Sequence, residues 1–369
     1  MGQSPAIFGT PDSKSKSMEC SFLCDNDPSW DEFVIGHPSG TFFHLLTWRE
    51  ILRKSFGYEP VYLWVRDSSG RVRGLLPLFL VKSMLFGRSL VAMPVGVYGG
   101  PVASDEESYR MLVHQATELA KARHVRYLEI RGNPYADTPI APHLNGDALR
   151  WSRKDLYVTF MSQIESTDEA NLARIPRKQR RMVRQGDKHG LRAIFDNGRL
   201  REFYDVYAES VRNLGTPVYG YSYFENLVSS FGDQCKILLV EYHEKIIAAV
   251  LSFFYREQVL PYYGGALKDY FHLAPNDFMY WELMRYAGAK GCKIFDFGRS
   301  KEGTGPYNFK RHWGFEPMAL PYWYYAPNGQ ALPDTSPLNP KLQWAIRIWR
   351  GLPLAITNSL GPHIVRHIP

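Results

Sequence analysis

The chain has 369 residues, of which 45% are hydrophobic and 22% are charged, and its formal net charge is +7 at pH 7. This length favours two domains, the basic excess favours an anionic partner, and no apolar run approaches the roughly 20 residues that cross a bilayer. The four cysteines have neither the spacing of a metal site nor the density of a disulfide scaffold, so we expect a cytoplasmic protein with reduced thiols and no metal.

The first half of the chain is predicted to form an α/β unit after a disordered leader over residues 1–17, which is rich in Ser, Lys, Gly and Pro. Periodicity and turn residues predict the elements of this unit. In chain order they are a helix over 41–56, strands over 61–65 and 72–81, a strand ending at Tyr98-Gly99-Gly100, a helix over 106–123 and a strand over 126–130.

The second half repeats this order of elements. The pattern predicts a helix over 200–211, strands over 237–241 and 246–254, a strand ending at Tyr263-Gly264-Gly265, a helix over 276–290 and a strand over 294–297. We interpret the repeat as two copies of one unit, spanning residues 18–165 and 166–330. Residues 331–369 are predicted to form an amphipathic helical tail.

The end of the second unit carries the most chemistry. Asp296-Phe297-Gly298-Arg299 is followed by a glycine-rich loop and by Lys310, so an acid, a guanidinium and an ammonium group lie within one short segment. This order is typical of a substrate pocket at a strand end.

This segment resembles the Fem-type peptidyltransferases. The shared features are the paired Tyr262-Tyr263, the Phe295-Asp296-Phe297 strand, the glycine loop at 303–305 and the Tyr-x-Phe-Lys segment at 307–315. The resemblance is nearest to FemAB-like proteins associated with PEP-CTERM/exosortase and exopolysaccharide loci, which share Gly-Arg-Ser-Lys-x-Gly-Thr-Gly and Trp-Gly-Phe-Glu-Pro.

The resemblance implies an α/β fold of two tandem GNAT-like domains with mixed central sheets and a C-terminal helical tail. It also implies transfer of an aminoacyl or acyl group to an amine on a cell-envelope or exopolysaccharide precursor. The stretch 167–189 is too short for the long helical-hairpin arm that some Fem enzymes carry.

We predict catalytic roles for three residues. Lys310 would stabilise an oxyanion or neutralise a donor phosphate, and the alternative is a solvated surface lysine. Asp296 would accept or orient the proton of the amine, and the alternative is a structural pairing with Arg299. Arg299 would stabilise developing negative charge.

Substrate contacts are predicted at three places. Six basic residues in the run 174–184 favour anion binding, and the anion is a tRNA, a nucleotide-linked glycan or a lipid-linked glycan. Tyrosines that end strands would line the cleft, with aromatic packing as the alternative. The predicted substrate-binding residues are Arg177, Lys178, Arg181, Tyr98, Tyr263, Tyr307 and Trp313.

The donor and the tail complete the predictions. The loop 266–274 has no glycine to cradle a pyrophosphate, which makes acyl-CoA the weaker donor. The resemblance to the Fem-type enzymes favours aminoacyl-tRNA as donor, and we expect no bound cofactor. Residues 340–368 carry a polar stripe at Gln343, Arg347 and Arg350, which fits either a membrane interface or docking on the protein itself. The alternatives for the whole chain are a CoA-dependent acyltransferase and a non-catalytic protein that binds anionic glycan or nucleic acid.

Overall fold

A computed structural model describes residues 18–84, 86–136, 150–329, 332 and 340–368, so the predicted leader lies outside the described residues. The strands are β1 (Glu19–Phe22), β2 (Glu59–Arg66), β3 (Val72–Ser83), β4 (Gly87–Ala92), β5 (Val102–Ala103), β6 (Tyr127–Arg131), β7 (Trp151–Gln163), β8 (Arg192–Phe195), β9 (Cys235–Tyr242), β10 (Lys245–Tyr255), β11 (Gln258–Ala266), β12 (Ile294–Lys301) and β13 (Pro317–Tyr325). The α-helices are α1 (Pro28–Gly36), α2 (Thr47–Phe56), α3 (Glu106–Ala122), α4 (Asp168–Arg174), α5 (Arg177–Lys188), α6 (Leu200–Leu214), α7 (Tyr221–Phe231), α8 (Pro275–Ala289), α9 (Gly305–His312), α10 (Pro340–Gly351) and α11 (Leu354–Val365).

The described strands form one continuous mixed sheet in the order β1-β2-β3-β4-β6-β13-β7-β12-β11-β10-β9-β8, with β5 beside β3. Each half contributes an antiparallel hairpin, β2 with β3 and β9 with β10. Each half also has one parallel pair, β4 with β6 and β11 with β12, joined through α3 or α8. The predicted repeat of one α/β unit, the mixed sheet and the helical tail are therefore confirmed.

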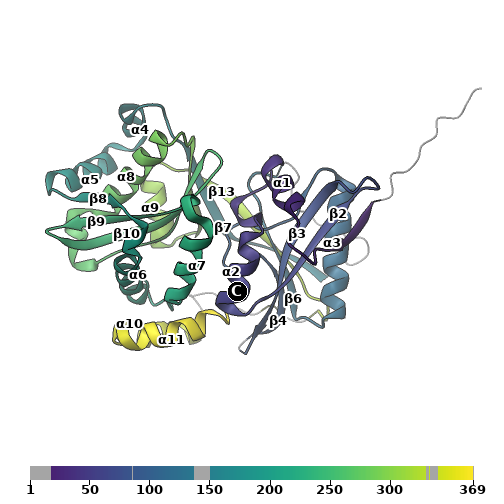
Figure 1. The fold of residues 1–369 in the computed structure, drawn as a ribbon. Coiled ribbons are helices and arrows are strands. Elements are labelled where there is room, and N and C mark those ends of the chain that lie inside the picture. Colours follow the sequence, from purple (N-terminus) through teal and green to yellow (C-terminus); the bar gives the residue numbers. More distant parts are fainter. Residues whose placement is uncertain (1–17, 85, 137–149, 330–331, 333–339, 369) are drawn as a thin grey trace, which may run out of the picture.

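The two halves exchange strands at their seam (Figure 1). Strand β13 comes from the second half but pairs with β6 of the first half, where Tyr322 lies opposite Arg131. Strand β7 ends the first half but pairs with β12 of the second, where Thr159 lies opposite Arg299. Side chains from distant parts of the sequence are thereby brought to the middle of the sheet.

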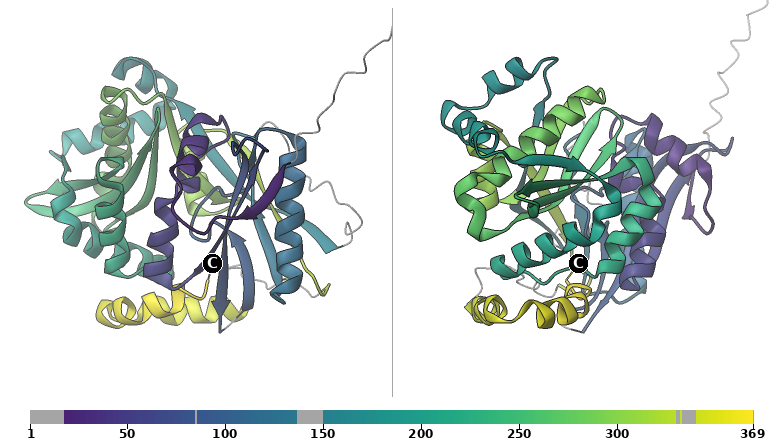
Figure 2. Two further views of the ribbon diagram at one scale, coloured as in Figure 1. Left: turned by 45° about the vertical axis from the view of Figure 1, so that its right-hand side comes forward. Right: turned by 60° about the vertical axis from the view of Figure 1, so that its left-hand side comes forward.

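An aromatic core also joins the two halves. The Phe42 ring lies 4.5 Å from the Phe253 ring, and the Trp48 ring lies 5.2 Å from the Phe231 ring, measured between centroids. Figure 2 shows α2 and α7 between the two parts of the sheet, while α3 covers the outer face of the first part. Burial of these rings favours a fixed arrangement of the two halves.

Two predicted elements differ from the structure. The predicted helix over 41–56 is divided into a short 3-10 turn, Phe42–His44, and α2. Strand β4 ends at Ala92, so Tyr98 lies on an irregular segment, whereas Tyr263 lies within β11. The chain leaves the strand because Met93 and Val95 adopt positive φ angles of 51° and 60°. The sequence pattern had indicated equivalent positions for the two tyrosines. The structure shows that this prediction is wrong.

Candidate functional site

The candidate site is built around a β-bulge in β12. Phe295 and Phe297 point into the hydrophobic core beneath α8, so the intervening Asp296 points to the opposite face of the sheet. The register between β12 and β7 shifts between Asp296 and Gly298, and Gly298 has a φ angle of +64°. The Gly298 N–H donates to Asp296 Oδ1 at 2.8 Å, so the bulge itself orients the carboxylate.

Two tyrosines from the first half hold the Asp296 carboxylate. Tyr98 Oη donates to Oδ2 at 2.9 Å and shares a 2.6 Å hydrogen bond with Thr159, and Tyr135 Oη lies 3.4 Å from Oδ2. Asp296 is 1% exposed. Burial raises the pKa of Asp296 to about 6, although hydrogen bonds from Gly298 and Tyr98 and the charge of Lys310 act in the opposite direction.

Lys310 approaches the same bulge from α9. Its Nζ donates to the carbonyl oxygens of Phe297, Gly298 and Arg299 at 2.7, 3.0 and 3.1 Å. Burial lowers the pKa of Lys310 to about 7, and the nearby Asp296 carboxylate opposes that shift. Asp296 and Lys310 are thus two buried groups whose pKa values both lie close to neutrality, an arrangement typical of sites for proton transfer.

Arg299 lies on the other side of the bulge and lines a small cavity of about 50 Å³. Its Nη1 donates to Tyr322 Oη at 2.7 Å, and its guanidinium lies 4.8 Å from the centre of the Tyr157 ring. The cavity is lined by Tyr127, Glu129, Arg131, Lys154, Tyr157, Arg299, Tyr322, Tyr324, Leu332 and Ile368.

The charge of this cavity is positive. Arg131 forms an ion pair with Glu129 at 2.7 Å, whereas none of the carboxylates in the described residues pairs with Arg299 or Lys154. Two uncompensated cations in a small half-buried space suit one carboxylate or one phosphate group. Asp296 and Lys310 do not line this cavity, so the three predicted catalytic residues share the bulge but not one open cleft.

The other predicted aromatic residues lie in the core. Tyr263 Oη hydrogen-bonds with Tyr223 Oη at 2.8 Å, and Trp313 Nε1 donates to Asp277 Oδ1 at 2.9 Å. Tyr307 is 8% exposed and packs edge-on against Phe160, with 5.4 Å between ring centroids. In the structure these three side chains contact protein partners and none of them contacts Asp296.

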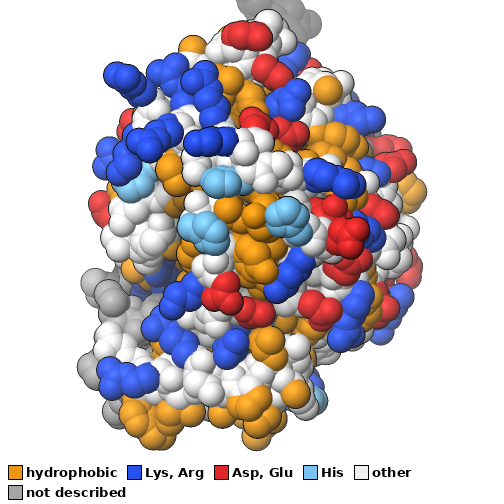
Figure 3. Space-filling view, turned by 90° about the vertical axis from the view of Figure 1, so that its left-hand side faces the viewer, with side chains coloured by type: hydrophobic (Ala, Val, Ile, Leu, Met, Phe, Trp, Pro, Cys, Tyr) orange, Lys and Arg blue, Asp and Glu red, His pale blue; other side chains and the backbone are white. Residues whose placement is uncertain are grey.

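The predicted basic residues Arg177, Lys178 and Arg181 lie on the exposed face of α5, where they border an open groove with Arg184 and Lys188. Figure 3 views this end of the molecule and shows Lys and Arg side chains gathered on it. The opposite face of α5 packs on the start of α8, where Gln179 Nε2 bonds to Asp277. The groove is therefore a surface separate from the bulge in β12.

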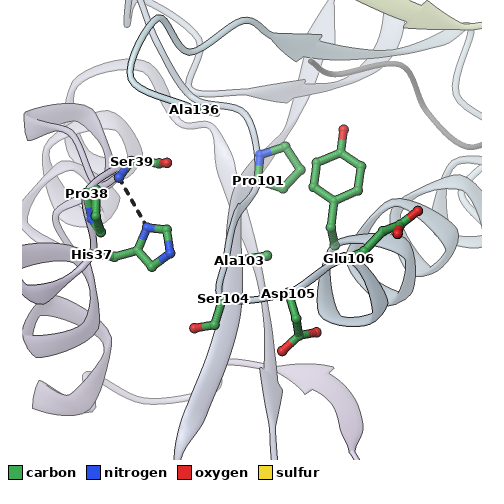
Figure 4. A pocket seen from close by; sticks show the side chains of 10 residues that line it. His37, Pro38, Ser39, Pro101, Ala103, Ser104, Asp105, Glu106 and Ala136 are labelled. Atoms are coloured by element: carbon green, nitrogen blue, oxygen red, sulfur yellow. Dashed lines mark hydrogen bonds between the residues drawn. The ribbon is translucent and has the colours of Figure 1, made fainter. Parts of the chain in front are cut away.

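A further cavity of about 250 Å³ lies wholly in the first half, and none of its lining residues was predicted from the sequence (Figure 4). Its two acids are neutralised, because Asp105 pairs with Arg73 at 2.7 Å and Glu106 pairs with Arg110. Without an uncompensated charge, this cavity offers less chemistry than the bulge.

Sequence reasoning missed several residues of the site, namely Tyr135, Lys154, Tyr157, Thr159, Arg131 and Tyr322. Tyr135 follows the end of β6, so its position just beyond a strand was an available signal. The others lie on strands whose neighbours are set by the strand exchange, and no local pattern indicates that pairing.

Comparisons with known proteins agree with this architecture. Residues 171–311 match the family described as acetyltransferase (GNAT) domain. The Lipid II:glycine glycyltransferase of Staphylococcus haemolyticus (strain JCSC1435) is 21% identical, and that of Staphylococcus epidermidis (strain RP62A) is 20% identical. Each of these alignments covers 77% of this chain and 87% of the relative.

Solved structures show the same fold. The crystal structure of FemX superposes with a TM-score of 0.65 at 18% identity and covers 83% of this chain and 97% of that chain. A tandem GNAT protein from the clavulanic acid biosynthesis pathway gives 0.55 at 12% identity and covers 85% and 100%. The predicted GNAT-like fold and the acyltransferase class are confirmed, and the comparisons support the resemblance to Fem-like proteins.

Proposed function

We propose that this protein is an aminoacyltransferase that acylates an amine on a lipid-linked or nucleotide-linked precursor of the cell envelope. The observation that carries the proposal is the buried Asp296 carboxylate, which two tyrosines of the first half hold against a bulge of the second half. Since its pKa is about 6, Asp296 is ionised at neutral pH and basic enough to accept a proton from a substrate ammonium group. The glycyltransferase relatives, which are named for lipid II, support this class of acceptor.

In the proposed reaction, the acceptor amine attacks the carbonyl carbon of an aminoacyl ester. A C–N bond forms, the ester C–O bond breaks, the amine proton passes to Asp296, and Asp296 returns this proton to the leaving alkoxide oxygen, so that the carboxylate is regenerated. Asp296 is covered in the structure, and its contact with Tyr135 at 3.4 Å is the longest of its hydrogen bonds. We place the amine where the Tyr135 hydroxyl now lies.

We assign Lys310 a positioning role. Its Nζ donates to three backbone carbonyls, so a direct bond to an oxyanion would require one of these bonds to break. In its present place the ammonium fixes the bulge and favours the ionised form of Asp296. A lysine whose N–H groups are already used contributes through charge more than through a new hydrogen bond.

We propose that the cavity beside Arg299 binds an anionic group of the substrate. Its volume of about 50 Å³ admits a single carboxylate or phosphate and excludes a whole nucleotide.

The chain resembles FemAB-like proteins of PEP-CTERM/exosortase loci. On that resemblance, we extend the candidate acceptors to exopolysaccharide precursors.

The start of α8 supports aminoacyl-tRNA over acyl-CoA as donor. A pyrophosphate at a helix N-terminus needs free backbone N–H groups, and Pro275 at the start of α8 removes one of them. The buried Asp277 places a carboxylate in the same turn, and Gln179 of α5 bonds to it. Helix α5 packs closely on α8, since an added Cβ at Gly186 would come within 2.6 Å of Phe278. The exposed basic face of α5 suits the phosphates of an RNA.

The test is a transfer assay with purified protein, amine-bearing lipid-linked and nucleotide-linked precursors, and either mixed aminoacyl-tRNAs or a set of acyl-CoAs. Mass spectrometry of the precursors detects the added group. We expect product with aminoacyl-tRNA, and a decrease of about 100-fold in kcat for Asp296→Asn. Ser300→Ala is the matched control on the same strand, because its buried hydroxyl has no hydrogen-bond partner among the residues that the structure describes.

Two outcomes would refute parts of the proposal. Turnover of acyl-CoA without use of aminoacyl-tRNA would overturn the donor assignment, and full activity of Asp296→Asn would overturn the role of the carboxylate. An absence of product with every donor, in a protein that binds RNA through α5, would instead favour the non-catalytic alternative.

A further inference from the structure

The C-terminal helices α10 and α11 dock on α6 through one face. Ile346 packs at Gly215, where an added Cβ would lie 2.4 Å from its Cγ2, and Trp349 is 9% exposed. Arg350 Nη2 donates to the Leu214 carbonyl at 3.1 Å. In α11, Gly361 lies so close to Val218 that an added Cβ would come within 2.8 Å of the Val218 carbonyl oxygen. The inner face of α10 and α11, which is the face toward α6, thus docks on the protein itself, as one of the two predicted alternatives stated.

The outer face of the same two helices is apolar. Trp344 and Ile348 on α10 are 69% and 44% exposed, and Ile356 and Leu360 on α11 are 43% and 47% exposed. Each pair has the i,i+4 spacing that places both side chains on one side of a helix. Figures 1 and 2 show that α10 and α11 follow one another along one side of the molecule, and Figure 3 shows hydrophobic side chains at that edge. We call these four side chains the outer apolar row.

The charged residues of the tail that carries the outer apolar row have one sign. Residues 335–369 contain no aspartate or glutamate, whereas they contain Lys341, Arg347, Arg350 and Arg366. Arg347 and Arg366 are exposed. An apolar row with a tryptophan, flanked by arginines and free of acids, has the composition of a helix that lies in the interface of an anionic membrane.

A second copy of the chain fits this surface less well. A two-fold contact would bring the same patch of both copies together, so the arginines would face arginines with no acid of the tail to compensate them. Four isolated large side chains also provide a smaller apolar surface than stable dimers bury. No helix among the described residues is long and apolar enough to cross a bilayer.

We propose that the outer apolar row binds the surface of an anionic bilayer, with its four side chains among the lipid headgroups and the flanking arginines against lipid phosphates. The inner face of the helices stays on α6, so binding needs no rearrangement of the fold. This inference does not rest on the transferase activity and is tested without it.

The test uses the full chain in flotation assays with vesicles of phosphatidylcholine alone or of an equimolar mixture with phosphatidylglycerol. We expect binding to the anionic vesicles, weaker binding as salt concentration rises, and little binding to phosphatidylcholine alone. The double substitution Trp344→Ser and Ile348→Ser should lower the fraction bound by about tenfold or more, because it removes half of the row. Both residues are exposed, so the thermal unfolding midpoint should stay unchanged.

The matched control is Phe22→Ser with Ile35→Ser, which removes two side chains that are 45% and 57% exposed in the first half, away from the tail. This control should bind vesicles as the unmodified protein does. Equal binding by the Trp344/Ile348 variant and the unmodified protein would overturn the proposal. It would also be overturned if the unmodified protein sedimented as a dimer without lipid, the variant sedimented as a monomer, and neither bound vesicles.

Discussion

In the proposed mechanism, Asp296 is the residue at which stability and function oppose each other. Its ordinary pKa of 3.8 rises to about 6 because it is buried, so the protein loses stability when the carboxyl ionises. The same burial makes the carboxylate a stronger base than an exposed aspartate. A residue that served folding alone would not need a carboxyl that is both buried and able to ionise.

The substitution Asp296→Asn should therefore stabilise the protein at neutral pH. A carboxyl whose pKa is raised in the folded state binds its proton more tightly there than in the unfolded chain, so stability falls as pH rises from about 4 to about 6 and the loss is complete above that window. Asparagine is neutral throughout. We expect a gain in unfolding free energy on the order of 2 kcal/mol at pH 7.5 and almost no gain at pH 4.

Urea denaturation at both pH values measures this difference. Ser300→Ala on the same strand should show no such pH-dependent gain, since its hydroxyl does not titrate. A variant that is less stable than the unmodified protein by equal amounts at both pH values would show that the burial of Asp296 carries no electrostatic cost.

At the residue scale, the sequence predicted Asp296, Arg299 and Lys310 because they lie within one local segment. It also placed Tyr98 near the cleft, although through a strand equivalence that the structure contradicts. It missed Tyr135, which meets Asp296 across 161 residues of chain, and Thr159, which meets Tyr98 across 61 residues. Local patterns do not encode such contacts, because they depend on which strands become neighbours.

At the scale of elements, the bulge in β12 does what a regular strand could not. It turns three successive carbonyls toward Lys310 and aims the Gly298 N–H at Asp296. The sequence predicted the strand over 294–297, and the structure extends it to Lys301. The glycine was visible in the sequence, but a bulge and a simple strand end look alike there.

The importance of the bulge is tested by Gly298→Ala. Alanine at a φ angle of +64° costs about 1 kcal/mol or more of stability. We expect in addition a large loss of kcat, because relief of this strain would move the backbone N–H of residue 298 away from the Asp296 carboxylate that it orients. Gly291→Ala is the matched control, since its φ angle is +84° and an added Cβ would meet nothing within 4 Å. It should lose similar stability and keep its activity, and equal losses of activity in both variants would contradict a special role for the bulge.

At the scale of the whole molecule, the repeat of elements was predictable because periodicity recurs in each half. The exchange of β7 and β13 was not, because alternation within a strand specifies which face is buried and leaves the neighbouring strand open. The division at residues 165 and 166 separates β7 from β12 and β13, its hydrogen-bonded neighbours. The surroundings of Asp296 are therefore assembled only when both halves are present.

This dependence predicts that the two halves fold as one unit. A fragment of residues 1–165 keeps β6 and β7 but leaves both without β13, and it exposes the aromatic core that Phe42 and Trp48 share with Phe253 and Phe231. Unpaired strand edges and exposed rings favour aggregation over folding. We expect each of the fragments 1–165 and 166–369 to be unfolded or insoluble alone, and soluble when both are expressed in the same cell.

The full chain should unfold in a single transition whether it is followed by circular dichroism or by tryptophan fluorescence. Two separate transitions, or a cooperatively folded fragment 1–165, would show that the exchanged strands do not couple the halves, and the site at their seam would then have to tolerate independent motion of Tyr98 and Asp296.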